Sequence, residues 1–286
     1  VQTIGRDPDY NNYFDGYISH LALVDGTALA PTVFGETDST SGIWKFKQPS
    51  GVTFGTNGFH LKMENSGALG TDSSGNSNTF TVNGNLKQAL DTPSNVYCTL
   101  NPLSTDSGVT LSNGNTESDY DASVGNAKGT LGFSSGKWYW EVKIATASSD
   151  YPMLGIGSLD EQQMQKPTGG SYPGGFTNSY GGYGNGNVYA NGSNTGSQSF
   201  SWATNDIIGI AVDLDSATKT IKWYKNGNST AIASYNITNA VPFTVMDYNG
   251  AEGSVNLQYN FGNGYFGTTA ITSAGSNGNG SLFEYD

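Results

Sequence analysis

The 286-residue chain lacks the residues on which several protein classes depend. It has a single cysteine, Cys98, so neither a disulfide within the chain nor a cysteine-rich zinc site is possible. Its only arginine is Arg6, and 12 basic side chains stand against 24 acidic ones, which gives a net charge of −12. Nucleic-acid binding needs Lys and Arg to neutralise phosphates, so we expect no nucleic-acid partner.

Long apolar runs and leader signals are missing as well. No stretch approaches the 18 apolar residues of a membrane-spanning helix, so we expect no membrane insertion. No basic segment followed by an apolar one marks a signal peptide. The chain begins with Val1 rather than Met, and we expect it to be a piece of a longer protein. Helical periodicity is hard to find, and charged residues are only 13% of the chain, which excludes helical bundles and coiled coils.

Glycine and tyrosine are abundant instead, with 40 Gly and 17 Tyr. Short runs in which apolar and polar residues alternate recur along the chain, separated by Gly- and Asn-rich turns. In residues 137–144 the even-numbered side chains, Trp138 and Trp140 among them, are predicted to face a core. The odd-numbered ones, Glu141 among them, take the other face, and Trp223 is predicted to be a core residue too. These patterns predict an all-β fold of antiparallel β-sandwiches.

The clarity of the pattern changes near the middle of the chain. Residues 104–126 are dense in Ser, Asn, Gly and Asp and predict loop or weak strand. Residues 169–197 are rich in Gly, Asn, Ser and Tyr, and the segment GGYGNG (181–186) within them predicts a flexible loop. We place a domain boundary at the start of the first polar region, which gives two domains, residues 1–103 and 104–286.

The second domain resembles a SPRY domain. The resemblance is carried, in order, by SGKWYWEVKI (135–144), MLGIGS (153–158), GNGNVYANGS (184–193), DIIGIAVDLDSATKTIKWYKNG (206–227), PFTV (242–245) and YNFG (259–262). It implies a bent sandwich of two antiparallel sheets, which binds peptides or other ligands through loops at one end. It also implies that this domain has no catalytic chemistry of its own.

The first domain resembles part of a laminin-G or concanavalin-like lectin sandwich. The residues that carry this second resemblance are FDGYISHLALVDGTALAPTVFGETD (14–38), followed by the glycine-rich segment 51–84 and by DTPSNVYCTLNPL (91–103). Together with GNGSLFEYD (278–286), the arrangement resembles tail-fibre and other virion structural proteins of marine bacteriophages. It implies a virion protein, outside the cell, that binds a host-surface glycan or protein, contacts other virion proteins and forms a homotrimer.

Three other functions remain open beside host adhesion. The chain would instead be a structural or decoration protein of the virion, a bacterial surface adhesin or filament protein, or an enzyme that trims surface polysaccharide. The last is not expected, because glycoside hydrolysis needs two carboxylates across a sugar bond and resemblance of fold does not supply such a site. The acidic pairs Asp119/Asp121 and Asp213/Asp215 have a spacing that favours turns which cap backbone amides.

A possible calcium site lies in the polar loop DSSGNSN (72–78). Asp72, Asn76 and Asn78 are its weak candidate ligands, since Ca²⁺ prefers carboxylate and amide oxygens. The loop lacks the spacing and the closing Glu of an EF-hand, and Asx-rich turns need no metal. The resemblance to laminin-G implies calcium. We expect no other cofactor.

The candidate ligand-binding residues come from a segment without charge. Residues 172–189 carry no charged side chain, and tyrosine offers a flat face together with a hydroxyl for a sugar or a peptide. The candidates are Tyr172, Phe176, Tyr180, Tyr183 and Asn185. For Tyr180 and Tyr183 packing and binding are equally open, and for Tyr189 we favour packing.

Overall fold

The computed structural model describes residues 2–7, 9, 12–14, 16–39, 42, 44–84, 86, 88, 96–120, 124–147, 152–159, 172–239, 241–250, 253–272 and 281–285. The chain divides into two compact units, residues 17–97 and residues 1–16 together with 98–286. Strands are the main regular element of the described residues, and the paired strands are antiparallel, so the predicted all-β class is confirmed. Within the described residues, no helix is long or apolar enough to span a membrane.

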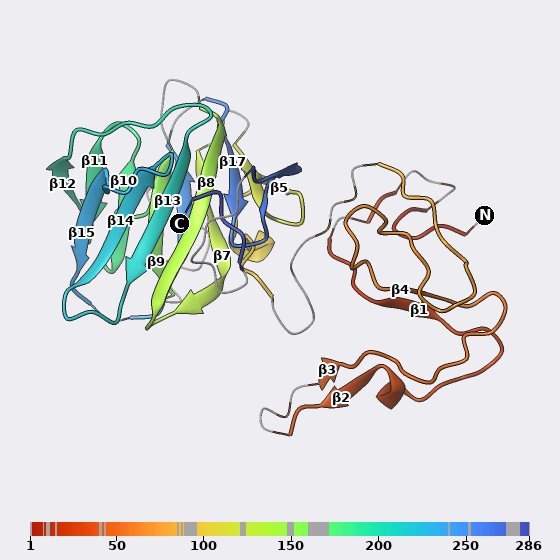
Figure 1. Cartoon of the computed structure of the whole chain (residues 1–286). Helices are drawn as coiled ribbons and strands as arrows, with labels where there is room; N and C mark the ends of the chain where they lie inside the picture. Colours follow the sequence, from red (N-terminus) through yellow and green to blue (C-terminus); the bar gives the residue numbers. More distant parts are fainter. Residues whose placement is uncertain are drawn as a thin grey trace. The chain divides into compact units, whose positions relative to one another are not determined.

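The larger unit is a sandwich of two antiparallel sheets (Figure 1). The six-stranded sheet has the order β12 (Ser193–Ser197), β11 (Asn187–Ala190), β10 (Ser179–Tyr183), β9 (Met153–Ser158), β16 (Phe243–Asn249) and β7 (Gly125–Phe133). The seven-stranded sheet has the order β15 (Ala233–Ile237), β14 (Lys219–Lys225), β13 (Ile207–Asp213), β8 (Lys137–Thr146), β17 (Asn256–Asn260), β6 (Glu117–Asp119) and β5 (Thr110–Ser112). A short hairpin of β18 (Tyr265–Phe266) and β19 (Thr269–Ala270) follows.

The sandwich also takes in the residues just before its first strand. Leu100 forms a bridge with Gly129 of β7, and the Thr130 amide donates to the Thr99 carbonyl at 2.8 Å. A short 3-10 helix, η2 (Pro102–Ser104), follows, and Asn101 caps it by accepting a hydrogen bond from the Leu103 amide. The boundary that we placed between residues 103 and 104 therefore lies inside the larger unit.

The core between the sheets is built from the inward faces of the strands. Trp223 is completely buried and its indole donates to the Leu154 carbonyl of the opposite sheet at 2.9 Å, which links the two layers. Trp140 is also buried, as predicted. The prediction for Trp138 is wrong, since its side chain is 42% exposed. It lies near the start of β8, where the sheet no longer covers it, and it stacks on Phe133 instead.

Two further predictions for this unit are corrected. Residues 181–186, predicted as a flexible loop, form the last part of β10 and the turn before β11, because glycine-rich strands lack the side chains by which alternation is recognised. Glu141, predicted on a half-buried strand with its side chain away from the core, has no exposed surface at all. The C-terminal residues Glu284 and Tyr285 donate their amides to its carboxylate and cover it.

The smaller unit, residues 17–97, holds two two-stranded antiparallel sheets in its described part. β1 (Leu21–Leu23) pairs with β4 (Phe59–Leu61), and β2 (Gly35–Thr37) pairs with β3 (Trp44–Phe46). A 3-10 turn, η1 (Pro31–Val33), precedes β2. Each strand has three residues. Beside these short strands, side chains satisfy part of the backbone, as where Asp72 accepts the His60 amide. The partial lectin-like sandwich stays a prediction.

Candidate binding site

Four tyrosines gather on the outer face of the six-stranded sheet, and we call them the tyrosine face: Tyr172, Tyr183, Tyr189 and Tyr248. Tyr183 pairs with Met153, and Met153 pairs with Tyr248, so the three residues form a row across β10, β9 and β16. Tyr189 of β11 pairs with Gly181, two residues from Tyr183, and therefore projects from the same face.

Tyr172 completes the tyrosine face from the segment that precedes β10. Its ring centroid lies 5.6 Å from those of both Tyr189 and Tyr248, and Tyr183 lies 6.4 Å from Tyr189. These spacings are those of edge-to-face and tilted aromatic pairs. All four rings are partly exposed, so each keeps some surface for a ligand.

A glycine lets the Tyr172 segment approach the sheet this closely. A side chain at Gly181 would bring its Cβ within 2.2 Å of the Pro173 carbonyl oxygen, so only glycine allows that backbone to lie on β10. The hydroxyl of Ser179 then binds the segment, accepting hydrogen bonds from the amides of Gly174 and Phe176 at 3.0 and 3.1 Å. The arrangement holds Tyr172 against the strand tyrosines.

The electrostatics of the tyrosine face are weak. Residues 172–189 contain no charged side chain. Burial, helped by the neighbouring Tyr172 and by the charge of Asp106, raises the pKa of Tyr248 above its usual value, so this hydroxyl stays protonated. The face therefore offers neutral rings and hydroxyls, which suit a neutral ligand better than an ion.

The other predicted ligand-binding residues lie in different places. Phe176 is partly exposed, and its ring lies over Gly157 of β9. Asn185 is exposed in the turn between β10 and β11, where its side-chain oxygen accepts the Asn187 amide at 3.1 Å. Both lie in the segment predicted for binding, and Asn185 shapes its own turn.

The prediction of Tyr180 as a ligand-binding residue is wrong. Its side chain is completely buried and points between the sheets. Tyr180 is an odd number of residues from Gly181 and Tyr183 on β10, so its side chain leaves the strand on the opposite face. The hydroxyl is held by Thr238, whose amide donates to it at 3.2 Å, and by the side chain of Asn191 at 3.4 Å. Tyr180 is a core residue with a satisfied hydroxyl.

Two members of the tyrosine face, Tyr189 and Tyr248, are not among the predicted ligand-binding residues. Tyr189 was expected to pack, and it does contact Tyr172 and Tyr183, but its ring remains partly exposed. Tyr248 was not singled out. The alternation of side chains along β16 would have indicated its position, since Val245 and Asp247 face inward and Tyr248 faces outward. Inside the sandwich, Asp247 fixes this register by accepting hydrogen bonds from Tyr120, Tyr259, Ser118 and the Ala127 amide.

The candidate calcium ligands of the smaller unit are engaged with protein groups. The Asp72 carboxylate accepts the His60, Ser74 and Asn78 amides at 2.8–2.9 Å and the Ser74 hydroxyl at 2.8 Å. Burial opposes the charge, but these hydrogen bonds outweigh it and lower the pKa of Asp72. The amide nitrogens of Asn76 and Asn78 donate to the Gly58 carbonyl, each at 2.9 Å.

This geometry corrects the prediction for the loop. A calcium ion needs several oxygens turned toward one point. Here the carboxylate faces N–H and O–H donors, and the two asparagines turn nitrogen toward backbone oxygen. In the part of the chain that the structure describes, no group of three or more His, Cys, Asp or Glu side chains is placed to hold a metal ion.

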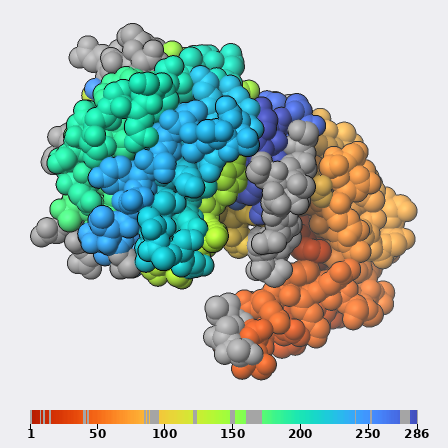
Figure 2. Space-filling model, turned by 60° about the vertical axis from the view of Figure 1, so that its left-hand side comes forward, coloured from red at the N-terminus to blue at the C-terminus, as the bar shows by residue number. Residues whose placement is uncertain are grey.

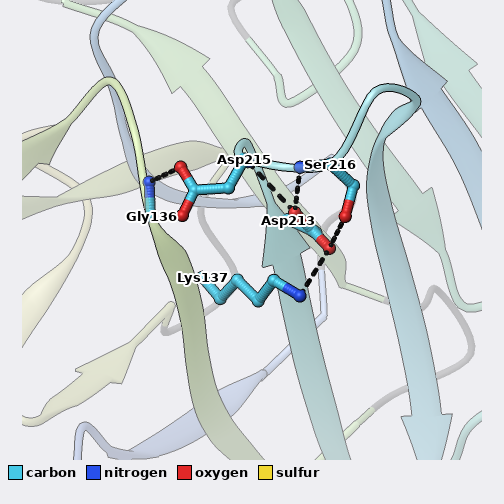
Figure 3. A network of polar contacts seen from close by, with 5 residues as sticks. All are labelled: Gly136, Lys137, Asp213, Asp215 and Ser216. Carbon is cyan, nitrogen blue, oxygen red and sulfur yellow. Dashed lines mark hydrogen bonds and ion pairs between the residues drawn. The ribbon is translucent and has the colours of Figure 1, made fainter.

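The acidic pair Asp213/Asp215 forms a capped turn, as its spacing predicted (Figure 3). Asp213 accepts the amides of Asp215 and Ser216 at 3.0 and 2.9 Å, and Asp215 accepts the Gly136 amide at 2.8 Å. The Ser216 hydroxyl, the Ser216 and Asp215 amides and Lys137 hold the pKa of Asp213 far below its usual value. Both carboxylates are occupied with backbone amides, Asp213 with those of its own turn and Asp215 with that of Gly136, which precedes β8.

The comparisons with known proteins identify the larger unit. Residues 137–263 match the family model of the SPRY domain, so this part of the chain is a SPRY domain, as predicted. SPRY domains are in general protein–protein interaction modules. No curated protein sequence matches the chain.

Several solved structures are similar to part of the chain. The chain is similar to the SPRY domain of human HERC1 at 17% identity and a TM-score of 0.46, over 56% of this chain and 96% of that one. It is similar to the PSpry domain of TRIM65 at 16% identity and a TM-score of 0.47, over 57% and 89%. Stonustoxin matches at 18% identity and a TM-score of 0.45, over 57% of this chain and 27% of the toxin.

Proposed function

We propose that the chain is a structural protein of a bacteriophage virion, part of a tail fibre, whose SPRY domain binds the host surface through the tyrosine face. The observation that carries the binding role is the gathering of four partly exposed tyrosines, three of them from the uncharged segment 172–189. The phage assignment is supported by the resemblance of residues 14–103 and 278–286 to marine phage fibre proteins. The role is binding and not catalysis, since glycoside hydrolysis needs two carboxylates facing each other across the sugar bond.

The ligand that best suits this face is a neutral glycan or an uncharged stretch of a surface protein. Tyrosine rings stack on sugar rings or peptide side chains, and their hydroxyls donate and accept hydrogen bonds. Because no charge takes part, we expect affinity to change little with salt. A homotrimer in the virion would present several copies, so weak single contacts would add through effective concentration.

The test is binding of the full chain to marine bacterial cells and to their purified surface glycans. A Tyr172→Ala/Tyr183→Ala double variant removes two rings of the tyrosine face, and Tyr13→Ala, at a 68% exposed residue, is the matched control. We expect selective binding that the double variant loses and the control keeps. Binding that survives in the double variant moves the site elsewhere. Absence of binding, even with the chain clustered on beads, overturns the adhesive role.

One observation favours a structural role in the virion as the second candidate. β12 is an edge strand in which all five residues are exposed, and it carries neither charge nor proline. Natural edge strands usually carry such residues to prevent pairing with other chains. A Thr195→Lys variant that weakens assembly with other virion proteins, while cell binding is kept, would support this function or that of a bacterial filament protein.

A further inference from the structure

Glu141 is a buried acid on the face of the seven-stranded sheet that points away from the core. Its neighbours along β8, Trp140 and Val142, face the core, so alternation turns Glu141 outward. A carboxylate on the outer face of a sandwich is normally in contact with water, yet the Glu141 carboxylate has no exposed surface. The residues that cover it are the last described ones of the chain, 281–285.

The cover is made by direct hydrogen bonds to the carboxylate. The Glu284 amide donates to Oε2 at 2.8 Å and the Tyr285 amide donates to Oε1 at 2.6 Å. Asn260 on the neighbouring strand donates its side-chain amide to Oε2 at 3.1 Å, and the Tyr139 hydroxyl donates to Oε1 at 3.2 Å. Two consecutive backbone amides of the C-terminal segment are therefore held by one side chain.

The side chains of the segment fit the sheet on both sides of this contact. Phe283 meets Tyr139 edge to face, with ring centroids 4.9 Å apart. Tyr285 lies against Gly227, where a Cβ would come within 2.4 Å of the ring. The segment adds no strand to the sheet, and its one bridge is between Leu282 and Asn263. In Figure 2 the dark blue C-terminal atoms lie beside the blue atoms of the sandwich.

We propose that residues 282–285 form a detachable strap, which docks on the outer face of the seven-stranded sheet through Glu141 and docks more tightly in mildly acidic than in alkaline solution. It is held by the Glu141 carboxylate, by side-chain contacts and by Leu282, whose amide donates to the Gly262 carbonyl and whose carbonyl accepts from the Asn260 side chain, each at 2.8 Å. The strands, in contrast, are held by continuous ladders. This goes beyond the proposed host binding, since the strap lies on the opposite sheet from the tyrosine face.

The sign of the pH effect follows from what surrounds the carboxylate. Its contacts are the Tyr139 hydroxyl on β8, Asn260 on β17 and the two strap amides, while β13 presents Gly209 opposite it. The charged side chain of the strap, Glu284, is turned to Thr272, whose amide donates to it at 2.7 Å. Burial, only partly offset by these hydrogen bonds, raises the pKa of Glu141 from 4.5 to about 7.

A released strap exposes Glu141 to water, where its pKa returns toward the ordinary value of 4.5. The docked state then binds a proton that the released state has lost over the pH range between these two values. Docking is therefore strongest below the lower value and weakens as the pH rises through about 7. Above that, the docked strap covers an ionised carboxylate and the affinity no longer changes.

Hydrogen exchange of the full chain, read by mass spectrometry, tests the strap. We expect the protection of residues 282–285, corrected for the intrinsic pH dependence of exchange, to fall on the order of 50-fold between about pH 5 and about pH 8. A peptide from β13 is the internal control and should keep its protection. Glu141→Gln, which carries no charge at any pH, should remove the pH dependence. Glu284→Gln, the matched control, should keep it.

Two results would overturn the proposal. One is protection of the strap that does not change with pH in the wild-type chain. The other is pH dependence that is equally large in Glu141→Gln. If that variant fails to fold, the carboxyl ¹³C shift of Glu141 in the wild-type chain gives the pKa directly, and a value near 4.5 rejects the strap mechanism. Neither result bears on binding at the tyrosine face, so the two proposals fail separately.

Discussion

The two units of the chain satisfy their backbone groups in different ways. In the larger unit, strands of up to ten residues pair over their whole length, and the apolar faces of two sheets meet. In residues 17–97 the strands have three residues each, and side chains such as Asp72 and Asn78 bind the backbone instead. Unpaired backbone groups are costly in the interior of a protein, so each unit needs one of the two solutions.

The difference predicts where each unit is sensitive to mutation. A sandwich depends on the volume and packing of its core, so the loss of a large apolar side chain matters most there. A unit held by side-chain hydrogen bonds depends on single polar groups, each of which serves several donors. Substituting a core tryptophan in the sandwich and a hydrogen-bonded carboxylate in the smaller unit, and measuring the loss of stability in each, therefore distinguishes the two architectures.

The largest effect is expected for Trp223→Ala in the sandwich. The side chain is completely buried and bonds the opposite sheet, so its loss leaves a cavity and removes the indole hydrogen bond to the Leu154 carbonyl. We expect the free energy of unfolding to fall by about 3–5 kcal/mol, measured by urea unfolding with circular dichroism. Trp138→Ala is the matched control. Its side chain is 42% exposed, and we expect a loss below about 1 kcal/mol.

An equal loss in both tryptophan variants would contradict this assignment of core and surface. It would mean that Trp138, near the start of β8, packs in the core in the same way as Trp140. The structure has Trp138 stacked on Phe133 with its indole donating to the Ser135 carbonyl at 2.7 Å, which are contacts within the connection from β7 to β8.

A smaller effect is expected for Asp72→Asn in the other unit. The new amide would turn N–H groups toward donors that now share the carboxylate, so we expect a loss of about 2 kcal/mol. Hydrogen exchange of a peptide over β4 reports it, because Asp72 accepts the His60 amide. Glu64→Gln, whose side chain is 69% exposed, is the control and should leave the exchange unchanged.

The same carboxylate makes the smaller unit sensitive to acid. The pKa of Asp72 is lowered in the folded chain, so its contribution to stability is present above the ordinary value of 3.8. It is lost as the pH falls through the lower, folded value. Acid should therefore open the exchange of β4 in the wild-type chain more than in Asp72→Asn. Identical acid profiles in the two chains would contradict the role of this carboxylate.

The sequence predicts the sandwich well where side chains alternate and poorly where glycine replaces them. The runs at β8, β13 and β14 have clear contrast between faces, and the structure has strands there. β10 has the sequence Ser-Tyr-Gly-Gly-Tyr, in which only the two tyrosines are large apolar side chains, and its last three residues were expected to belong to a flexible loop. Those glycines are needed because Pro173 lies directly on Gly181, a contact that the sequence does not reveal.

The candidate site was predicted only in part, because the glycines of β10 hide the strand and therefore the faces on which its tyrosines lie. Tyr172 and Tyr183 were chosen as aromatics of an uncharged segment, and the structure brings them together with Tyr189. Without a strand register, Tyr180 could not be separated from Tyr183, although their side chains leave β10 on opposite faces. Tyr248 comes from a distant strand, and the cover over Glu141 comes from the end of the chain, so both depend on tertiary structure.

The smallest effect is expected in the β13–β14 hairpin of the sandwich, where polar groups act as they do in residues 17–97 (Figure 3). Lys137 lies 3.3 Å from Asp213 and is 67% exposed, so Lys137→Met should leave the Tm unchanged, because exposed ion pairs contribute little. Asp213→Ala also removes the acceptor of the Asp215 and Ser216 amides, and it should lower the Tm measurably. A larger shift for Lys137→Met than for Asp213→Ala would mean that the ion pair, and not the capped turn, holds this hairpin.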